Sequence, residues 1–240
     1  MRVKRGSSLA PAPLSPSLSP SLRLKAASLR RQAGALARRL PEIYPDAHCK
    51  LDYSNPLELL VATILSAQCT DKRVNIVTKA LFQRCKSAED FASISQEELE
   101  DLVRTTGFFR NKAKNIRAMA ATLLTEHGGE VPRTLEALAA LPGVGRKTAN
   151  VVLGNAFGLD EGVVVDTHVT RLSHRLGLTT KTTAEKIEQD LIRLFPRELW
   201  TDLSHWLIWH GRRRCSARRP DCPHCELQDI CPSANRAEKI

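Results

Sequence analysis

The sequence predicts an all-α protein, and two observations lead to this prediction. From about residue 28 onward, apolar residues recur at spacings of three and four, most clearly over 112–124 and 199–208, as in helices that bury one face. The strand-like run Val163-Val-Val165 is too short to build a sheet. We therefore expect roughly ten short helices.

Three helix starts support this prediction. Asn55-Pro-Leu-Glu58 places a capping residue before a proline at the first helical position, with an acid in the first turn. Ser95-Gln-Glu-Glu98 has the capping-box pattern, and Thr182-Thr-Ala-Glu185 repeats it. Each precedes apolar residues with helical spacing, so each is expected to begin a helix.

Length and composition describe an ordinary globular protein. The chain has 240 residues, of which 42% are apolar and 26% charged, enough for one large or two small domains. No apolar run approaches the ~18 residues that a transmembrane helix needs, so we expect no membrane partner. Seven cysteines without a secretory signal indicate free thiols in a reducing compartment such as the cytoplasm.

The net charge of +10 comes from one end of the chain. Residues 1–41 hold nine of the 36 Lys and Arg and no acid, which leaves 27 basic residues against 26 acidic ones. The total charge therefore gives no argument for nucleic acid. Two local clusters do suit phosphates: residues 210–219 carry five arginines, and 110–117 carry four cations. Solvated helix faces explain either cluster equally well.

Residues 1–27 are predicted to form a disordered basic tail. Six serines and four prolines fall within the first 21 residues, a composition that does not support a packed structure. Ser and Pro also interrupt any signal-peptide core. Two interpretations of the tail remain open: an organelle transit peptide, or a basic arm that contacts DNA.

The most informative segment is Leu135-Glu-Ala-Leu-Ala-Ala-Leu-Pro-Gly-Val-Gly-Arg-Lys-Thr-Ala-Asn-Val-Val152. A short helix should end near Ala140, and a second should begin directly after the Pro-Gly-Val-Gly turn. Gly143 and Gly145 would let backbone N–H groups approach a phosphate, and the second helix would add the positive end of its dipole. Such a turn binds a DNA backbone without reading sequence. A plain turn between two helices is the alternative.

This segment resembles the helix–hairpin–helix of the base-excision DNA glycosylases. The segment Val165-Asp-Thr-His-Val169 resembles the loop and aspartate that complete the motif of that superfamily, and its Asp lies nineteen residues after Lys147. The resemblance implies that Lys147 is the nucleophile and Asp166 the catalytic carboxylate. It covers about residues 28–232, in which three separated motifs appear in the expected order.

The chemistry of a lysine nucleophile fits this sequence. An amine can break the glycosidic bond at C1′ and hold the sugar as a Schiff base, but only when the amine is neutral. Neutralising a lysine at about pH 7.4 costs about 4 kcal/mol, and burial or a helix N-terminus lowers that cost. Lys147 falls in the first turn of its predicted helix. Asp166 opens the next predicted helix, where it can cap the helix and still stabilise positive charge at C1′.

Four cysteines follow the spacing C-x6-C-x2-C-x5-C near the C-terminus: Cys215, Cys222, Cys225 and Cys231. Four thiolates can bind zinc or an iron–sulfur cluster, and ligand type alone favours zinc. The spacing resembles the cluster loop of endonuclease III and its adenine-glycosylase relatives, which implies a 4Fe–4S cluster with a structural role. By the same resemblance, the arginines between the first two cysteines face phosphates.

A glycosylase must extrude its target nucleotide and fill the hole that it leaves. Leu65-Ser-Ala-Gln-Cys-Thr-Asp71 resembles the family segment whose Gln fills that space, which assigns Gln68. Thr106-Gly-Phe-Phe-Arg-Asn-Lys-Ala113 resembles the loop whose apolar residue wedges between bases, which assigns Phe108, with Phe109 next in line. Core packing is the alternative for either phenylalanine.

The resemblance also implies two helical domains. Residues 50–159 would form a central domain with the hairpin, and residues 28–49 together with 160–235 would form the domain of the cluster. His168 and Arg171, on the helix that follows the catalytic carboxylate, are predicted to contact phosphate or the lesion strand. A packing role is the alternative for both.

The implied enzyme is a bifunctional glycosylase and abasic-site lyase of the endonuclease III family. We expect a monomer in the bacterial cytoplasm that acts on double-stranded DNA with an oxidised pyrimidine or an abasic site. A monofunctional adenine or mismatch glycosylase is the first alternative. Such relatives generally lack a lysine at the position of Lys147, and the adenine enzymes use a Glu that residues 63–70 lack. A non-enzymatic DNA-binding scaffold is the second alternative.

Overall fold

The computed structural model describes the backbone of residues 20–234 and the side chains of residues 24–234. Every regular element in this range is helical, which confirms the predicted all-α fold. The α-helices are α1 (Pro20–Ile43), α2 (Pro56–Ser66), α3 (Asp71–Arg84), α4 (Ala88–Ser93), α5 (Gln96–Val103), α6 (Phe109–His127), α7 (Leu135–Ala140), α8 (Arg146–Val152), α9 (Thr167–Arg175), α10 (Ala184–Leu194) and α11 (Trp200–Arg213). Shorter helical turns are η1 (Arg104–Thr106), the π-turn η2 (Leu153–Phe157), η3 (Arg197–Leu199) and η4 (Gln228–Ile230).

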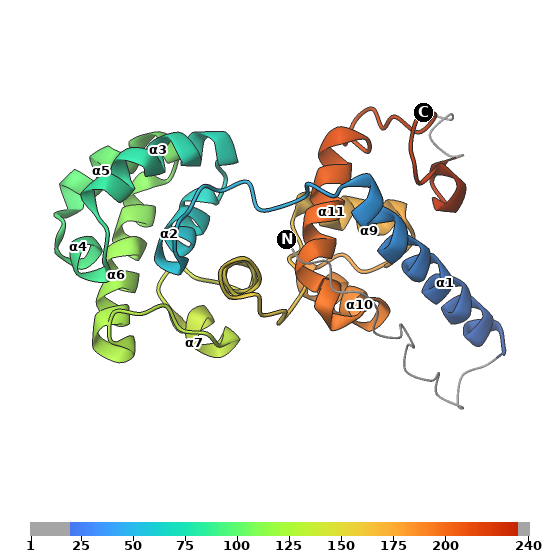
Figure 1. Cartoon of the computed structure of the whole chain (residues 1–240), viewed down its shortest axis with the longest axis horizontal. Coiled ribbons are helices and arrows are strands. Elements are labelled where there is room, and N and C mark those ends of the chain that lie inside the picture. Colours follow the sequence, from blue (N-terminus) through green and yellow to red (C-terminus); the bar gives the residue numbers. More distant parts are fainter. Residues whose placement is uncertain (1–19, 235–240) are drawn as a thin grey trace. The chain divides into compact units, whose positions relative to one another are not determined.

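None of the described helices is long and apolar enough to cross a membrane. The helices form two compact units (Figure 1). The central unit is His48–Glu161 and contains α2 to α8. The terminal unit combines the described residues up to Ala47 with those from Gly162 onward, and contains α1 and α9 to α11. Each unit has a hydrophobic core of its own.

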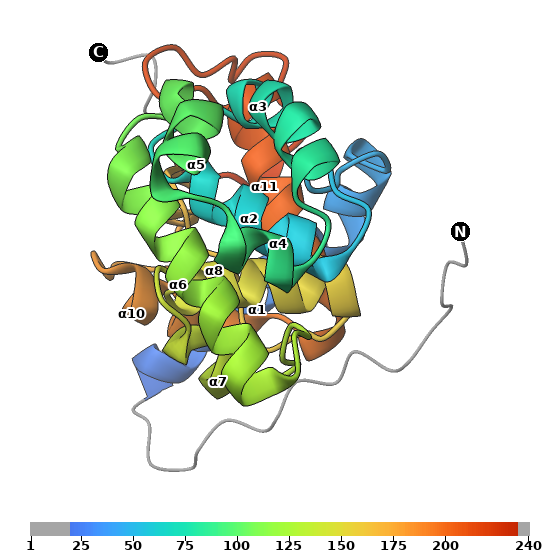
Figure 2. The same cartoon turned by 90° about the vertical axis from the view of Figure 1, so that its left-hand side faces the viewer.

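Helix α6 lies in the core of the central unit. Its Ala113, Ile116, Met119 and Leu123 have no exposed surface, as the periodicity over 112–124 predicts. Helices α4 and α5 pack on α6, and α8 packs on α2 and on α7 (Figure 2). The hairpin between α7 and α8 is therefore held by helices that are themselves part of the core.

The terminal unit is built around α11, on which α9 packs. Leu203 of α11 and Leu36 of α1 are fully buried in the same core. The strand-like run Val163–Val165 is a buried extended segment, and the N–H of Val164 donates to Ser204 Oγ at 2.9 Å. A side-chain hydroxyl thus satisfies this backbone group in place of a neighbouring strand, and no strand occurs among the described residues.

Two of the three predicted helix starts are confirmed by their hydrogen bonds. Asn55 Oδ1 accepts from the N–H of Glu58 at 2.9 Å, and Pro56 occupies the first position of α2. Ser95 Oγ accepts from the N–H of Glu98 at 3.0 Å. Each cap satisfies a donor that the first turn of the helix leaves without an internal partner.

The capping box predicted at Thr182 is wrong. The N-cap of α10 is Thr183, and it forms no side-chain cap bond. The chain ahead of this helix is held instead by Thr179, whose hydroxyl donates to Asp190 at 2.6 Å and accepts from the N–H of Lys181 at 3.0 Å. A contact with the body of α10 therefore sets this turn, and local sequence did not show it.

The predicted disordered tail extends too far into the chain. Its residues 1–19 lie outside the described residues, but residues 20–27 form the first turns of α1. The sequence explains this difference, because residues 21–33 contain neither proline nor glycine to interrupt a helix. Pro20 itself is tolerated in the first turn of a helix.

Candidate functional site

The predicted hairpin between two helices is present in the central unit. Helix α7 ends at Ala140 and α8 begins at Arg146. The turn between them is closed by a hydrogen bond from the N–H of Val144 to the carbonyl of Leu141 at 3.1 Å, and both side chains are buried. The apolar residues of the turn thus fix it to the core, while its glycines are exposed.

The two glycines of the turn have different roles. Gly143 has φ of +76°, and a Cβ there would lie 2.7 Å from the Cβ of Asn115 on α6, so both the backbone conformation and the space require glycine. Gly145 is the N-cap of α8 with φ of −97°, and it offers no side-chain cap to the helix. A Cβ on Gly145 would meet nothing within 4 Å. The positive end of α8 is therefore open to an approaching anion.

Lys147 lies in the first turn of α8, as predicted. Its side chain is exposed. Of the two features that we expected to favour a neutral amine, the structure supplies the helix N-terminus, and burial is missing. The amine is consequently accessible to a substrate that approaches the hairpin turn.

Asp166 caps α9 in the terminal unit, which confirms the predicted capping role. Its Oδ1 accepts a hydrogen bond from the N–H of Val169 at 2.8 Å. The carboxylate is half-buried, and among the described residues no donor bonds to its second oxygen. One oxygen therefore holds the helix start while the other stays available for chemistry.

Gln68 and Phe108 share an unusual backbone conformation. Among the described residues, they are the two non-glycine residues with positive φ, at 54° and 47°. Both side chains are exposed, and Phe108 exposes 65% of its surface. Such strain costs about 1–3 kcal/mol per residue and clusters at functional sites. These are the residues to which the resemblance assigns the filling of the vacated space, for Gln68, and the wedge between bases, for Phe108.

The core-packing alternative applies to Phe109 and not to Phe108. Phe109 packs against the core of the central unit. The guanidinium groups of Arg104 and Arg110 lie 5.4 and 5.1 Å from its ring centre, within the range of cation–π attraction. Phe108 is exposed and is not part of the core of the central unit, so core packing does not account for its large apolar side chain.

Arg171 turns toward the protein interior. Its Nη2 donates to the carbonyl oxygens of Gly211 and Cys215, both at 3.1 Å, and lies 3.1 Å from His168 Nδ1. A Cβ on Gly211 would come within 2.9 Å of both the Arg171 and the His168 side chains. These contacts favour the packing role of Arg171 over the DNA contact that we predicted.

The four cysteines line one hollow of the terminal unit, together with Leu172, Leu176 and Leu227. Its empty volume is about 360 Å³, including the part open to solvent. Burial raises the pKa of the thiols of Cys225, Cys231 and Cys222, so thiolates here require a positive partner such as a metal.

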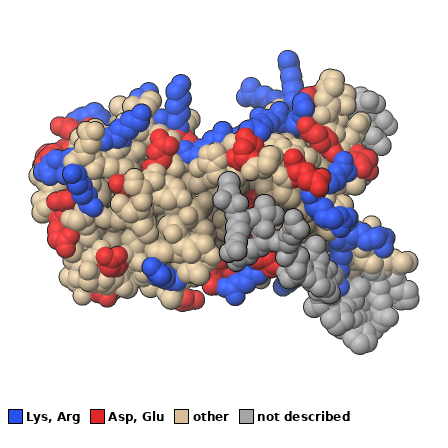
Figure 3. Space-filling model, viewed as in Figure 1, with Lys and Arg blue, Asp and Glu red and all other residues tan. Residues whose placement is uncertain are grey.

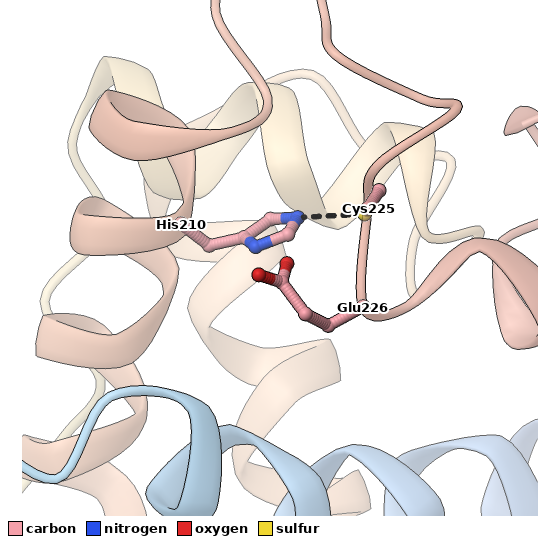
Figure 4. Close-up of side chains that lie close together, drawn as sticks. All are labelled: His210, Cys225 and Glu226. Carbon is pink, nitrogen blue, oxygen red and sulfur yellow. Dashed lines mark hydrogen bonds between the residues drawn. The ribbon is translucent and has the colours of Figure 1, made fainter.

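The sulfurs of the four cysteines are spaced more widely than in a site with one zinc ion. Zn–S bonds of about 2.3 Å place the sulfurs of a tetrahedral site roughly 3.8 Å apart. In the described part of the chain, three metal-ligating groups within 4.8 Å of one another occur at His210, Cys225 and Glu226 (Figure 4), and no three cysteine sulfurs are that close. The four cysteines that line this hollow can hold a metal centre.

Motif reasoning missed the residues that support the cysteine loop. Arg175 Nη1 donates to the Cys215 Sγ at 3.1 Å and to the Ser216 carbonyl at 2.7 Å, and its Nη2 donates to the Ala217 carbonyl at 2.8 Å. Arg214 pairs with two carboxylates, at 3.0 Å each: Asp221 and Glu226. The loop is therefore held by charge-assisted hydrogen bonds from α9 and from the end of α11.

A buried histidine also faces this loop. His210 Nδ1 lies 2.8 Å from the Tyr44 hydroxyl, and Nε2 lies 3.7 Å from Cys225 Sγ. Burial lowers the pKa of His210 from 6.5 to about 4, so the ring is neutral at neutral pH. A ring that accepts from Tyr44 at Nδ1 carries its hydrogen on Nε2, directed at the sulfur. The signal available in the sequence was a lone histidine five residues before Cys215.

Part of the basic cluster at 210–219 is used within the protein. Arg213 pairs with Asp46 at 2.8 Å and lies over the Trp209 ring at 4.2 Å. Arg218 and Arg219 are exposed, and no ion pair involves them in the described residues. Figure 3 shows Lys and Arg side chains gathered over the end of α11 and the loop that follows it. The outward part of this cluster is thus available for phosphates.

Comparisons with known proteins agree with this geometry. Residues 61–197 match the family described as HhH-GPD superfamily base excision DNA repair protein. Endonuclease III of Synechocystis sp. is 54% identical over 214 residues, which cover 89% of this chain and 98% of that protein. A non-covalent endonuclease III–DNA complex aligns with a TM-score of 0.83 at 42% identity, over 88% of this chain and 99% of the other. A trapped endonuclease III–DNA covalent intermediate aligns with a TM-score of 0.83 at 43% identity and the same coverage.

Proposed function

The chain belongs to the HhH-GPD superfamily of base excision DNA repair proteins and, within it, to the endonuclease III family, and on this premise we propose the chemistry of its site. The protein is a DNA glycosylase and abasic-site lyase that acts on double-stranded DNA. We assign oxidised pyrimidines, such as thymine glycol, and abasic sites as its substrates. The bacterial relatives support action on DNA in the bacterial cytoplasm.

The observation that carries this proposal is the position of Lys147. Its amine is exposed in the first turn of α8, beside a helix start that Gly145 leaves uncapped and open. Backbone N–H groups at this turn bind the DNA phosphates, and the same turn presents the amine. One short segment thus supplies both the DNA contact and the nucleophile.

The reaction proceeds through a Schiff base at Lys147. The neutral Nζ attacks C1′ of the damaged nucleotide, and the C1′–N bond breaks with its electron pair leaving on the base. The C1′–O4′ bond then breaks to open the sugar ring, one amine proton passing to the departing base and the other to O4′, which gives an imine between Nζ and C1′. Removal of a proton from C2′ then breaks the C3′–O bond and cuts the strand. Water finally hydrolyses the imine and frees the lysine.

Asp166 supplies negative charge to this reaction. Its Oδ1 is held by the N–H of Val169, which fixes the carboxylate without neutralising it. A fixed carboxylate stabilises the positive charge that develops at C1′ as the base leaves.

The hollow of the four cysteines would hold a 4Fe–4S cluster. Cys215, Cys222, Cys225 and Cys231 would be its ligands: all four line this hollow, and the family relationship supports a cluster over zinc. The cluster would cross-link the loop and take no part in bond cleavage. Arg175 and His210 would donate hydrogen bonds to the cysteine sulfurs, which fixes the ligands.

Gln68 and Phe108 would enter the DNA stack when the damaged nucleotide leaves it. Both are exposed and held with positive φ, so their side chains are already projected away from the core. Extrusion costs a few kcal/mol of stacking and pairing, and an apolar ring offsets part of this cost by restoring the stack.

Base release and strand cleavage, measured side by side, test the proposed function. An end-labelled duplex with one thymine glycol is incubated with the protein, and half of each sample is then heated in alkali. We expect equal strand cleavage in both halves. Cleavage that appears only after alkali would make the protein a monofunctional glycosylase. Absence of base release, with DNA binding intact, would leave a binding scaffold.

A further inference from the structure

Lys112 is a buried cation that the proposed chemistry does not use. It lies in the first turn of α6 and exposes 5% of its surface. Its Nζ donates to the carbonyl oxygen of Leu65 at 2.8 Å and to that of Thr106 at 2.7 Å. No carboxylate pairs with it among the described residues. Desolvation lowers the pKa of Lys112, and a buried ammonium is costly unless it is well bonded. The burial of this cation therefore calls for a purpose.

The two carbonyl groups belong to the two segments with strained backbone. Leu65 lies in the last turn of α2, three residues before Gln68. Thr106 ends η1, two residues before Phe108. Both carbonyls lie at helix ends, where backbone acceptors lack partners within the helix. One ammonium group thus joins the two turns that carry the exposed left-handed residues.

We propose that Lys112 is a positioning residue for base extrusion, which holds the Gln68 turn and the Phe108 turn in fixed register so that both side chains enter the DNA together. The inference rests on the proposed roles of Gln68 and Phe108. It goes beyond them because it makes the two residues a coupled pair. A hydrogen-bonded cation suits this task, since its two acceptors come from segments separated by 41 residues.

A selective defect distinguishes this role from a merely structural one. A lysine that only stabilises the fold would lower all activities in proportion to the fraction unfolded. If Lys112 positions the extrusion residues, its loss should slow only reactions in which a base must leave a duplex. The reaction on a single-stranded abasic substrate, which has neither a base to extrude nor a partner strand, should keep its rate. The test therefore compares a lesion duplex with a single-stranded abasic oligonucleotide.

The central variant is Lys112→Met, which keeps the length of the side chain and removes the donors. Lys79→Met is the matched control, because Lys79 is an exposed lysine of the same unit. Phe108→Ala and Gln68→Ala are the reference variants. Three quantities are measured on the full-length protein: the single-turnover rate on a thymine-glycol duplex, the fluorescence change of 2-aminopurine opposite the lesion, and borohydride trapping on the single-stranded abasic oligonucleotide.

We expect Lys112→Met to slow the duplex reaction at least about ten-fold, or ~1.4 kcal/mol in barrier. The 2-aminopurine change should shrink in parallel, as in the reference variants, while trapping on the single strand stays within about two-fold of wild type. Lys79→Met should match wild type in all three. If Lys112→Met fails to fold, Lys112→Gln takes its place, since its amide retains N–H donors on a stem shorter by one bond. The same selective pattern is expected.

Two results would overturn the inference while the proposed function stands. One is a folded Lys112 variant with the duplex rate and fluorescence change of Lys79→Met. The other is an equal loss on the duplex and on the single strand. If instead Phe108→Ala and Gln68→Ala leave the duplex reaction unchanged, the extrusion roles themselves are wrong, and the inference falls with them.

Discussion

Gly143 and Asn115 are packed so closely that a Cβ on Gly143 would lie 2.7 Å from the Cβ of Asn115. Gly143 also has φ of +76°. Two independent costs therefore oppose any side chain here: a left-handed backbone costs an L-residue roughly 1–2 kcal/mol, and overpacking costs about 1–3 kcal/mol. The contact ties the hairpin turn to α6.

Gly143→Ala should lower the free energy of unfolding by about 2–5 kcal/mol, measured by urea denaturation. Asn115→Ala should restore only part of this loss, because it leaves the Cβ in place. Gly145→Ala is the matched contrast. Its φ of −97° and open surroundings accommodate a Cβ, so stability should change little while DNA affinity falls. A Gly143 variant as stable as wild type would show that the turn is not held as described.

Asp166→Asn separates helix capping from catalysis. Asn caps nearly as well as Asp, so stability should stay within about 0.5 kcal/mol of wild type. Base excision should fall by about 10²–10³-fold, because the fixed negative charge is lost. Asp166→Ala should lose both activity and about 1 kcal/mol of stability. Full excision activity in Asp166→Asn would leave this residue with the capping role alone.

Phe108 and Phe109 are expected to respond oppositely to truncation. Phe108→Ala removes an exposed ring, so the unfolding free energy should change by no more than about 0.5 kcal/mol, while duplex excision falls. Phe109→Ala removes a ring that packs on the core between two guanidinium groups, so it should destabilise by about 1–3 kcal/mol. Thermal denaturation and single-turnover excision measure the two effects. A large stability loss in Phe108→Ala would contradict its assignment.

Arg175→Met tests the support of the cysteine loop. The variant loses donors to Cys215 Sγ and to the carbonyls of Ser216 and Ala217. Loss of such supporting contacts lowers metal affinity by about 10- to 100-fold. Iron should therefore be released faster to a chelator, and the loss of visible absorbance measures this release. Arg193→Met, which changes an exposed arginine of α10, is the control. Equal iron retention in both variants would show that Arg175 does not hold the loop, and colourless protein with bound zinc would contradict the cluster itself.

Local signals were enough to predict much of this structure. The caps at Asn55 and Ser95, the turn at Gly143 and the placement of Lys147 in a first helical turn depend on residues within a few positions of one another. Caps and turns that depend on such neighbouring residues can be predicted from a single sequence. The periodicity over 112–124 likewise predicted which face of α6 is buried.

Contacts between distant residues were not predictable in the same way. The direction of Arg171 depends on the absence of a side chain at Gly211, 40 residues away. In the sequence Lys112 belongs to a basic cluster, but in the structure it is buried and donates hydrogen bonds to two carbonyl groups from other elements. The start of α10 depends on the Thr179–Asp190 contact. In each case tertiary packing overrides a local pattern.

The central claim is that Lys147 forms the covalent bond to DNA. Borohydride reduction traps a Schiff base as a stable amine, so wild-type protein mixed with a thymine-glycol duplex and borohydride should give a protein–DNA band on a denaturing gel. Lys147→Ala should give none, while Arg146→Ala, the adjacent exposed cation, should still give the band. A band of undiminished strength in Lys147→Ala would place the nucleophile elsewhere, and no band from wild-type protein that binds the duplex would contradict Schiff-base chemistry.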